Sequence, residues 1–393
     1  MYARGSMDFV TTLATTDQTI GSTIESTDKA WGSRTFYLHS DCIRQDSALL
    51  ARSFPDRSNR SWAIAPVTNM DDTYRHHGIM LVKVPKSASS TSAGVALRIS
   101  ERHGNISVTW KHDIASVKDY GNRHPTKSFL FGSVRDPASR TISHLSFAAS
   151  LFQQTPITED QMLARLQNSD NLPRREGNPR LGQSQGRGGP QIRFMSLQKI
   201  PKYALWDPTH PTTVQNVTYA RQLVKDIIHR YDFLLLVERM DESLVAMSMV
   251  MGVDVGDLLV VSSKIAGTYY YVPQRRKNPR CVKLQNPQVT ETIQAYVKSK
   301  EWYAMNYGDY LLHSAVNKSL DLTIDRLGRH RFESTLRDYR RLKAMVDTVC
   351  ANQIHLPCSS KGRPQPDLAK QSCYATDIGC GFPCIDNMLG KEG

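Results

Sequence analysis

Two apolar runs, each followed by a polar break and then a helical pattern, dominate the chain. The run Ile79–Val84 ends in a hydroxyl-rich segment, and apolar positions at helical spacing resume at Ala93. The run Phe129–Val134 also ends abruptly, and Pro137 suits the first turn of the helix that is predicted to follow. Each segment is therefore typical of a buried strand, a polar loop and a helix.

Similar patterns predict further elements along the chain. Strands that alternate with helices are typical of an α/β domain in which helices flank a central parallel sheet. The further predicted elements are strands at Thr35–Leu38, Ser107–Trp110 and Phe233–Val237, and helices at Thr155–Leu166, Val217–Tyr231, Glu242–Met251, Thr290–Lys300, Tyr303–Leu327 and Phe332–Val349.

Composition divides the chain into three parts. Residues 1–75 are rich in Thr, Ser and Asp and are predicted to form an extension that is partly ordered at most. Residues 76–345 are predicted to form the α/β domain, and residues 346–393 form a cysteine-rich tail. A chain of 393 residues is long enough for one large domain with such extensions.

Charge restricts the partners of the protein more than its fold. Fifty Lys and Arg residues against 37 Asp and Glu residues give a formal net charge of +13. This balance favours nucleic acid, an anionic polysaccharide or a nucleotide as partner, and it does not choose among them. No apolar run of about 18 residues occurs, so we expect no membrane span in this chain, and its start lacks the apolar core of a signal peptide.

The segment between the first strand and its helix has the composition of an anion-binding loop. A lysine supplies a mobile charge, and the N–H groups of a helix start point at one spot. The alternative is an ordinary helix with a Ser/Thr N-cap. The G-x-x-x-x-G-K-[ST] pattern of a Walker A loop is absent, which weakens an ATPase or kinase assignment. The candidate residues are Lys86, Ser87, Ala88, Ser89, Ser90, Thr91 and Ser92.

The second strand ends in the pattern R-D-P-x-x-R-x-x-S, which offers a second anion site. Arg135 follows the strand directly, and Ser143 lies two turns into the predicted helix. Arginine's planar fork of donors matches a phosphate dianion better than lysine does. The alternative is a salt-bridged surface helix. An anion site shared by both segments requires that Lys86 and Arg135 lie side by side.

As a pair, the two segments resemble the donor-binding motifs of sulfotransferases that use 3′-phosphoadenosine 5′-phosphosulfate (PAPS). Val84–Ser92 resembles the 5′-phosphosulfate loop, and Ser133–Ser143 resembles the 3′-phosphate motif. The chain is most similar to the galactose-3-O-sulfotransferase-like and uronyl 2-O-sulfotransferase group of Golgi enzymes. Phe233–Gly252 and Trp302–Arg341 also resemble segments of that group, so that the likeness covers roughly residues 76–345. The chain departs from the pattern of these enzymes in the first loop, where Ala88 and Ser89 stand in the place of the usual glycine.

The resemblance implies a P-loop NTPase-like fold, PAPS as donor, no required metal and a hydroxyl acceptor on a glycan that can be anionic. Lys86 would hold the 5′-phosphate and the bridging oxygen, the loop hydroxyls would cradle the same phosphate, and Arg135 and Ser143 would bind the 3′-phosphate. The resemblance also implies the Golgi lumen or the secretory pathway, with the usual membrane anchor missing from this chain. Nucleic acid is then not expected as a partner.

His112 is the candidate catalytic base. It follows the strand predicted at Ser107–Trp110, and ligands bind at the carboxyl ends of strands in open parallel sheets. Its pKa suits proton removal from a hydroxyl near neutral pH, and the uronyl 2-O enzymes have their catalytic histidine in this interval. The alternative is a hydrogen-bonded structural histidine. Weaker rivals for the role of base are His103, His124, Glu101 and Asp113.

Two polar segments are candidates for contacts with the substrates. Asn168–Phe194 is dense in Gly, Pro and Arg and is predicted to be a long loop that covers the acceptor or the nucleotide, with Arg193 returning near the donor. A solvated flexible insert is the alternative. Tyr269–Tyr271, close to a basic run at Arg275–Arg280, suit sugar rings and anionic chains, or rim packing.

Cysteine usage and glycosylation sequons indicate an oxidising compartment. The tail contains five of the seven cysteines at spacings that favour disulfides over zinc, and at least one cysteine must lack an intramolecular partner. Four Asn-x-Ser/Thr sequons, at Asn59, Asn105, Asn216 and Asn317, agree with a secretory route.

The sequence therefore predicts a sulfotransferase that moves a sulfuryl group from PAPS to a hydroxyl. A P-loop kinase or nucleotide hydrolase is one alternative, although it needs a magnesium-binding acid that the sequence does not place. A non-catalytic, basic glycan-binding protein of the same fold is another.

Overall fold

The structure, a computed structural model, describes eleven stretches of the chain, all of them within the unit Leu38–Gly393. The strand predicted at Thr35–Leu38 and the candidate base His112 lie outside the described residues. The described residues are 40–63, 76–111, 120–153, 156–167, 190–197, 217–261, 267–272, 279–354, 356–365, 373 and 380–390.

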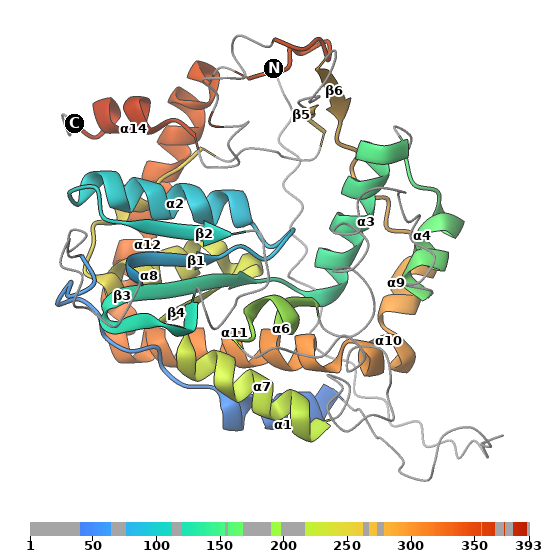
Figure 1. The fold of residues 1–393 in the computed structure, drawn as a ribbon, viewed down its shortest axis with the longest axis horizontal. Coiled ribbons are helices and arrows are strands. Elements are labelled where there is room, and N and C mark those ends of the chain that lie inside the picture. Colours follow the sequence, from blue (N-terminus) through green and yellow to red (C-terminus); the bar gives the residue numbers. More distant parts are fainter. Residues whose placement is uncertain are drawn as a thin grey trace. The chain divides into compact units, whose positions relative to one another are not determined.

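A four-stranded parallel sheet with helices around it organises the domain, as predicted (Figure 1). The strands are ordered β2-β1-β3-β4, so the two strands that precede the predicted anion-binding segments are neighbours. The strands are β1 (His76–Val82), β2 (Val108–Lys111), β3 (Arg123–Val134) and β4 (Phe233–Leu236), and β5 (Tyr269–Val272) with β6 (Arg280–Lys283) in a separate antiparallel hairpin.

Helices account for most of the remaining described chain, and none of those in the described ranges has both the length and the apolar character needed to cross a bilayer. The helices are α1 (Ser40–Leu50), α2 (Ser89–Arg102), α3 (Pro137–Gln153), α4 (Glu159–Gln167), α6 (Pro190–Met195), α7 (Val217–Arg230), α8 (Met240–Met251), α9 (Glu291–Val297), α10 (Lys300–Met305), α11 (Tyr307–Leu327), α12 (Arg329–Val349) and α14 (Phe382–Met388), with 3₁₀ turns η4 (Val237–Arg239), η5 (Val255–Leu258) and η6 (Ala351–Gln353).

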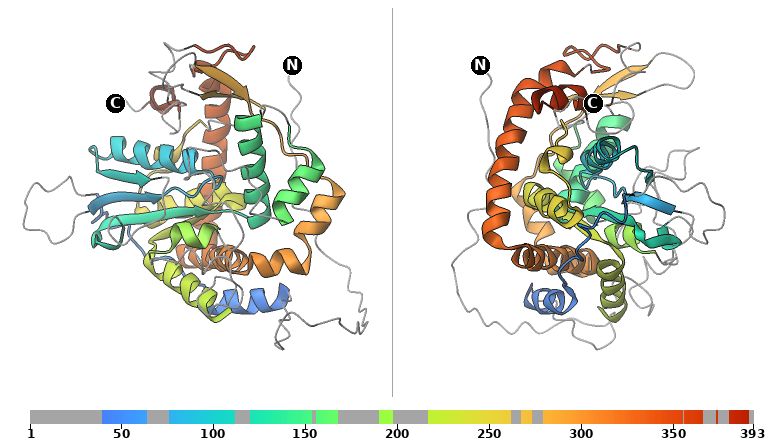
Figure 2. Two further views of the ribbon diagram at one scale, coloured as in Figure 1. Left: turned by 45° about the vertical axis from the view of Figure 1, so that its right-hand side comes forward. Right: turned by 90° about the vertical axis from the view of Figure 1, so that its left-hand side faces the viewer.

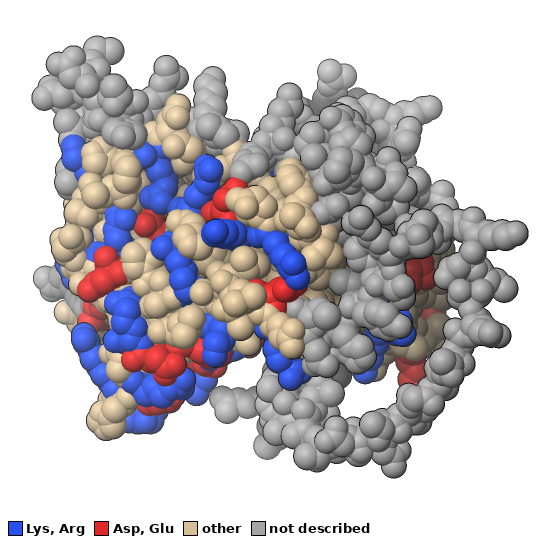
Figure 3. Space-filling view, turned by 90° about the horizontal axis from the view of Figure 1, so that it is seen from below, with Lys and Arg blue, Asp and Glu red and all other residues tan. Residues whose placement is uncertain are grey.

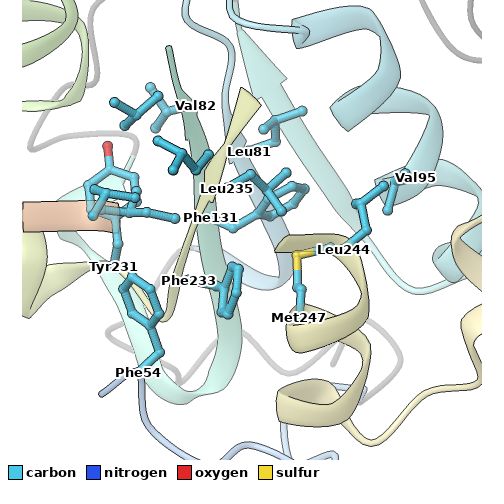
Figure 4. Packing of buried hydrophobic residues seen from close by; sticks show 14 of the residues in the cluster. Phe54, Leu81, Val82, Val95, Phe131, Tyr231, Phe233, Leu235, Leu244 and Met247 are labelled. Carbon is cyan, nitrogen blue, oxygen red and sulfur yellow. The ribbon is translucent and has the colours of Figure 1, made fainter. Parts of the chain in front are cut away.

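Both faces of the sheet are buried, which explains the near-continuous apolar runs of its strands. On one face, Leu81 and Leu235 pack with Val95 of α2 and Leu244 of α8 (Figure 4). On the other face Gly132 of β3 lies so close to Met195 of α6 that an added Cβ would approach its methyl group to 2.8 Å. Glycine at this position therefore allows α6 to pack directly on the sheet.

Residues 40–63, which the composition assigned to an extension, contribute to the core of the domain. The helix α1 packs on α11 and α7 (Figure 2). There Asp46 accepts hydrogen bonds from Arg221 and from the Tyr307 hydroxyl. Further along, the Phe54 ring lies 4.7 Å from that of Phe233, and Phe54 and Trp62 are fully buried. The ordered domain therefore includes a segment upstream of residue 75.

The predicted disulfides are present in the C-terminal third of the chain. Cys281–Cys358 joins β6 to the tail, Cys350–Cys384 joins the end of α12 to α14, and Cys373–Cys380 closes a short loop. These bridges use six of the seven cysteines. Disulfides of this kind indicate folding in an oxidising compartment, such as the secretory pathway.

The sequons differ in their accessibility, which predicts where glycans attach. Asn59 and Asn105 are exposed, whereas Asn317 lies in α11, accepts a 2.7 Å hydrogen bond from Arg239, and is followed by the fully buried Ser319. Expression in a secretory host should therefore give glycans at Asn59 and Asn105 and none at Asn317. Peptide mapping after enzymatic deglycosylation measures this, and occupancy at Asn317 would contradict the packing of α11.

Candidate functional site

The carboxyl ends of β1 and β3 bring the two predicted anion-binding segments together. Val82 pairs with Gly132 in the parallel ladder, so both chains leave the sheet at the same edge. Beyond this edge Arg135 Nη1 donates a 3.1 Å hydrogen bond to the Lys86 carbonyl oxygen, and Ser133 Oγ donates to the Ser87 carbonyl oxygen. The adjacency of Lys86 and Arg135 that the sequence required is therefore present.

The loop after β1 turns sharply into α2 through two left-handed residues. Lys86 has a φ of 64° and Ala88 a φ of 53°, a region that glycine adopts without the strain of other residues. Ala88 is the N-cap residue of α2, and its methyl side chain offers no acceptor to the first-turn N–H groups. The alternative of a Ser/Thr N-cap is thus not what this helix has, and an anion suits those N–H groups.

The hydroxyl residues predicted to lie in the loop form its end and the first turn of α2. Ser87, Ser89 and Ser92 are buried, and Ser92 Oγ donates to the Ala88 carbonyl oxygen at 3.1 Å. Ser90 and Thr91 are half-buried. The buried serines therefore shape the turn, and the pair Ser90 and Thr91 is the more accessible to a ligand.

Helix α3 stands across this edge of the sheet, rising from the end of β3 past the loop toward the β5–β6 hairpin (Figures 1 and 2). Ser143, predicted to bind the 3′-phosphate, is half-buried on α3. Phe147 follows one turn later on the same helical face, and the Lys86 ammonium nitrogen lies 4.2 Å from its ring centroid. Ser143 therefore lies on the side of α3 that faces Lys86.

Gln191 of α6 clamps the backbone of Arg135. Its Oε1 accepts a 2.8 Å hydrogen bond from Arg135 N, and its Nε2 donates a 2.7 Å bond to Arg135 O. Ser87 Oγ also donates to Gln191 Oε1 at 3.4 Å, so one amide touches both anion-binding segments. Residues 190–194, predicted as the end of a long loop, instead belong to the helix α6, and residues 168–189 lie outside the described residues. In α6 the residue that contacts Arg135 is Gln191, and Arg193 is half-buried two residues later.

A fully buried carboxylate fixes the start of α6 in turn. Asp309 of α11 accepts hydrogen bonds from Gln191 N at 3.1 Å and Ile192 N at 3.0 Å. Burial raises the pKa of Asp309, opposed by these N–H donors and by the positive charge of Arg140. Burial lowers the pKa of Arg140, in α3, to about 10, with Asp309 opposing the shift. Two buried groups that can carry opposite charges, Asp309 and Arg140, thus lie close to the candidate site.

Two acidic residues lie next to Arg135: Asp136, which follows it in the chain, and Glu238 of the turn η4. Glu238 accepts a 2.9 Å hydrogen bond from Asp136 N and lies 3.2 Å from His313 Nε2. Burial opposes ionisation of Glu238, yet the His313 and Asp136 hydrogen bonds hold its pKa below the ordinary value. Burial lowers the pKa of Arg135, and Glu238 and Asp136 oppose that shift. These carboxylates therefore offset part of the cost of burying the positive charge of Arg135.

Three of the rivals of His112, namely His103, Glu101 and His124, lie away from this edge. His103, at the carboxyl end of α2, is paired with Asp257 at 3.0 Å, and Glu101 lies in the same last turn. His124 lies near the amino end of β3, opposite to the end that leads into Arg135. Both His112 and Asp113 lie outside the described residues.

Comparison of the chain with protein-family models, with curated proteins and with solved structures found no match in any of the three. The site is therefore interpreted from its own geometry. Within the described ranges, no cluster of three or more His, Cys, Asp and Glu residues is placed to hold a metal ion. Among the described residues on the face seen from below, Lys and Arg side chains are interspersed with Asp and Glu, and they form no single positive patch (Figure 3).

The Asp309 network predicts a large, local effect on stability. Replacing Asp309 with Ala leaves two buried N–H groups without an acceptor, and should lower the free energy of unfolding by roughly 2–6 kcal/mol. Asp325→Ala, on the same helix, removes a carboxylate whose side chain is 51% exposed and paired with Arg329, and should cost about 1 kcal/mol or less. Urea denaturation compares the two variants; equal losses would contradict the buried role of Asp309.

Proposed function

We propose that the protein transfers a sulfuryl group from PAPS to a hydroxyl, with a glycan as the acceptor class. The observation that supports this most directly is the contact between Arg135 and the Lys86 carbonyl oxygen. A lysine in a helix-start loop and an arginine at the neighbouring strand end suit the two separate phosphates of one adenosine 3′,5′-bisphosphate group. A donor that lacks the 3′-phosphate, such as ATP, would leave Arg135 and Ser143 without their ligand.

The proposed chemistry depends on positioning and charge stabilisation. Transfer of this kind passes through a loose transition state, as phosphoryl transfer does, in which negative charge builds on the leaving oxygen. Lys86 would neutralise that oxygen, while the N–H groups and hydroxyls at the start of α2 hold the 5′-phosphate. Arg135, clamped by Gln191, and Ser143 would bind the 3′-phosphate.

We also propose a fold family, a cellular location and a catalytic base. The loop, the parallel sheet and the order of motifs favour a P-loop NTPase-like fold without a Walker A sequence. The disulfides agree with the Golgi lumen as the location. His112, one residue past the end of β2, is the proposed base that takes the proton of the acceptor hydroxyl.

Nucleotide binding tests the assignment of Arg135. Isothermal titration should show that adenosine 3′,5′-bisphosphate binds more tightly than adenosine 5′-monophosphate, and that Arg135→Ala weakens the bisphosphate about 10- to 100-fold because charge-assisted hydrogen bonds are lost. The monophosphate should be affected much less. Arg337→Ala, which removes an exposed charge from α12, is the matched control. Equal affinities of the wild type for the two nucleotides would refute the proposed donor.

Turnover tests the catalytic roles. With radiolabelled PAPS and a panel of glycans, Lys86→Ala should nearly abolish transfer, and His112→Ala should lower kcat by about 100-fold or more, as expected for the loss of a general base. Chelator should leave the rate unchanged, whereas a kinase or nucleotide hydrolase would depend on magnesium. Wild-type turnover in Lys86→Ala would refute its role, and wild-type turnover in His112→Ala would place the base elsewhere.

A further inference from the structure

The proposed reaction requires that the Lys86 ammonium group is held in one place as well as that it is charged. A lysine side chain has four methylene groups and loses considerable rotamer freedom when it is held in one place. In the proposed reaction the bond between sulfur and the bridging oxygen of the donor breaks while a bond to the acceptor oxygen forms. The acceptor proton passes to the base, and the electron pair of the broken bond remains on the bridging oxygen. A cation held at that oxygen therefore stabilises the transition state more than the ground state.

The aromatic ring of Phe147 holds the ammonium group of Lys86. The nitrogen lies 4.2 Å from the ring centroid, within the range of a cation–π interaction. Both residues are half-buried, so the interaction is only partly screened by water. The ring stands on α3, one turn beyond Ser143, so it approaches Lys86 from the wall of the site.

Phe147 is itself held by the β5–β6 hairpin. The ring of Tyr270 in β5 meets it edge-on, with centroids 5.5 Å apart and planes at 87°, which is a favoured geometry for aromatic pairs. The contact therefore fixes the orientation of the ring that faces Lys86.

The hairpin is attached to the same end of α3 by hydrogen bonds on both sides of the aromatic pair. Arg280 Nη2 donates to the Leu151 carbonyl oxygen at 3.1 Å, and Gln285 N donates to Ser150 Oγ at 3.1 Å. The Cys281–Cys358 disulfide ties β6 to the tail. In that tail Gly362 packs so closely on the Tyr269 ring that an added Cβ would approach it to 2.6 Å.

We propose that Phe147, oriented by Tyr270, is a positioning residue that holds the Lys86 ammonium where the leaving oxygen of the sulfuryl donor develops its charge. This inference rests on the proposed function. It assigns a role in catalysis to the β5–β6 hairpin, an element that contributes neither to the parallel sheet nor to the donor loop.

Paired substitutions separate this role from simple packing. Phe147→Leu and Tyr270→Leu remove the aromatic ring, whereas Phe147→Tyr and Tyr270→Phe retain it. With saturating donor, Phe147→Leu should lower kcat about 3- to 30-fold with little change in the KM for PAPS, and Phe147→Tyr should retain most of the activity. Tyr270→Leu should lower kcat by a smaller factor than Phe147→Leu does, and Tyr270→Phe should leave kcat close to the wild-type value. The double variant with both leucine changes should lose less than the product of the two single losses, because both changes act on the same contact. The melting temperatures of the four variants show whether a loss of kcat reflects a loss of packing.

A measurement on Lys86 itself adds a readout that does not depend on turnover. With lysine labelled with ¹³C at Cε, and the Lys86 signal assigned by Lys86→Arg, a side chain above a ring face should show an upfield ring-current shift. The shift should vanish in Phe147→Leu and remain in Phe147→Tyr. A wild-type signal without this shift would overturn the inference.

The kinetic outcomes distinguish the inference from the function beneath it. Equal kcat in Phe147→Leu and Phe147→Tyr, in a wild type that transfers sulfate, would overturn the positioning role alone. A wild type that neither transfers sulfate nor prefers adenosine 3′,5′-bisphosphate would overturn the proposed function and, with it, this inference.

Discussion

The parallel hydrogen-bonded pairing of β1 with β3 is the constraint on which the candidate site depends. Because the two strands are neighbours and run in the same direction, their carboxyl ends leave the sheet together. One end turns through the left-handed Lys86 and Ala88 into α2, and the other passes through Arg135 into α3. No movement of the backbone is needed to bring the two cationic side chains to one edge.

Buried polar groups near that edge fix the positions of the two segments relative to each other. Asp309 holds the start of α6, Gln191 of α6 clamps the Arg135 backbone, and Arg140 supplies the opposing charge. Such a network favours one arrangement because each buried donor or acceptor that loses its partner is costly. The rigidity of the site thus originates in α11 and α6, which contribute neither of the two cations.

The sequence was sufficient to predict the parallel sheet, most of the helices around it and the adjacency of Lys86 and Arg135, because apolar runs end where strands end. It did not predict α1, α6, α14 or the β5–β6 hairpin. It was not sufficient to find Gln191 or Asp309, since a contact across more than 50 residues leaves no local pattern. Residues 40–63 were assigned to an extension because the first 75 residues are rich in Thr, Ser and Asp, a composition that hides single core residues such as Phe54 and Trp62. Each of these two is nevertheless fully buried against the domain.

The disulfide between Cys281 and Cys358 makes the structure around the site depend on the redox state of the compartment in which the protein folds. The parallel sheet contains none of the bonded cysteines, so its pairing is independent of oxidation. The hairpin that orients Phe147 is different, because a covalent link fastens it to a segment 77 residues away. A chain kept in a reducing compartment would have the sheet and the loop between β1 and α2, but its hairpin would be held only by non-covalent contacts, such as those with α3. Maturation of the protein would then be completed by the redox state of its surroundings.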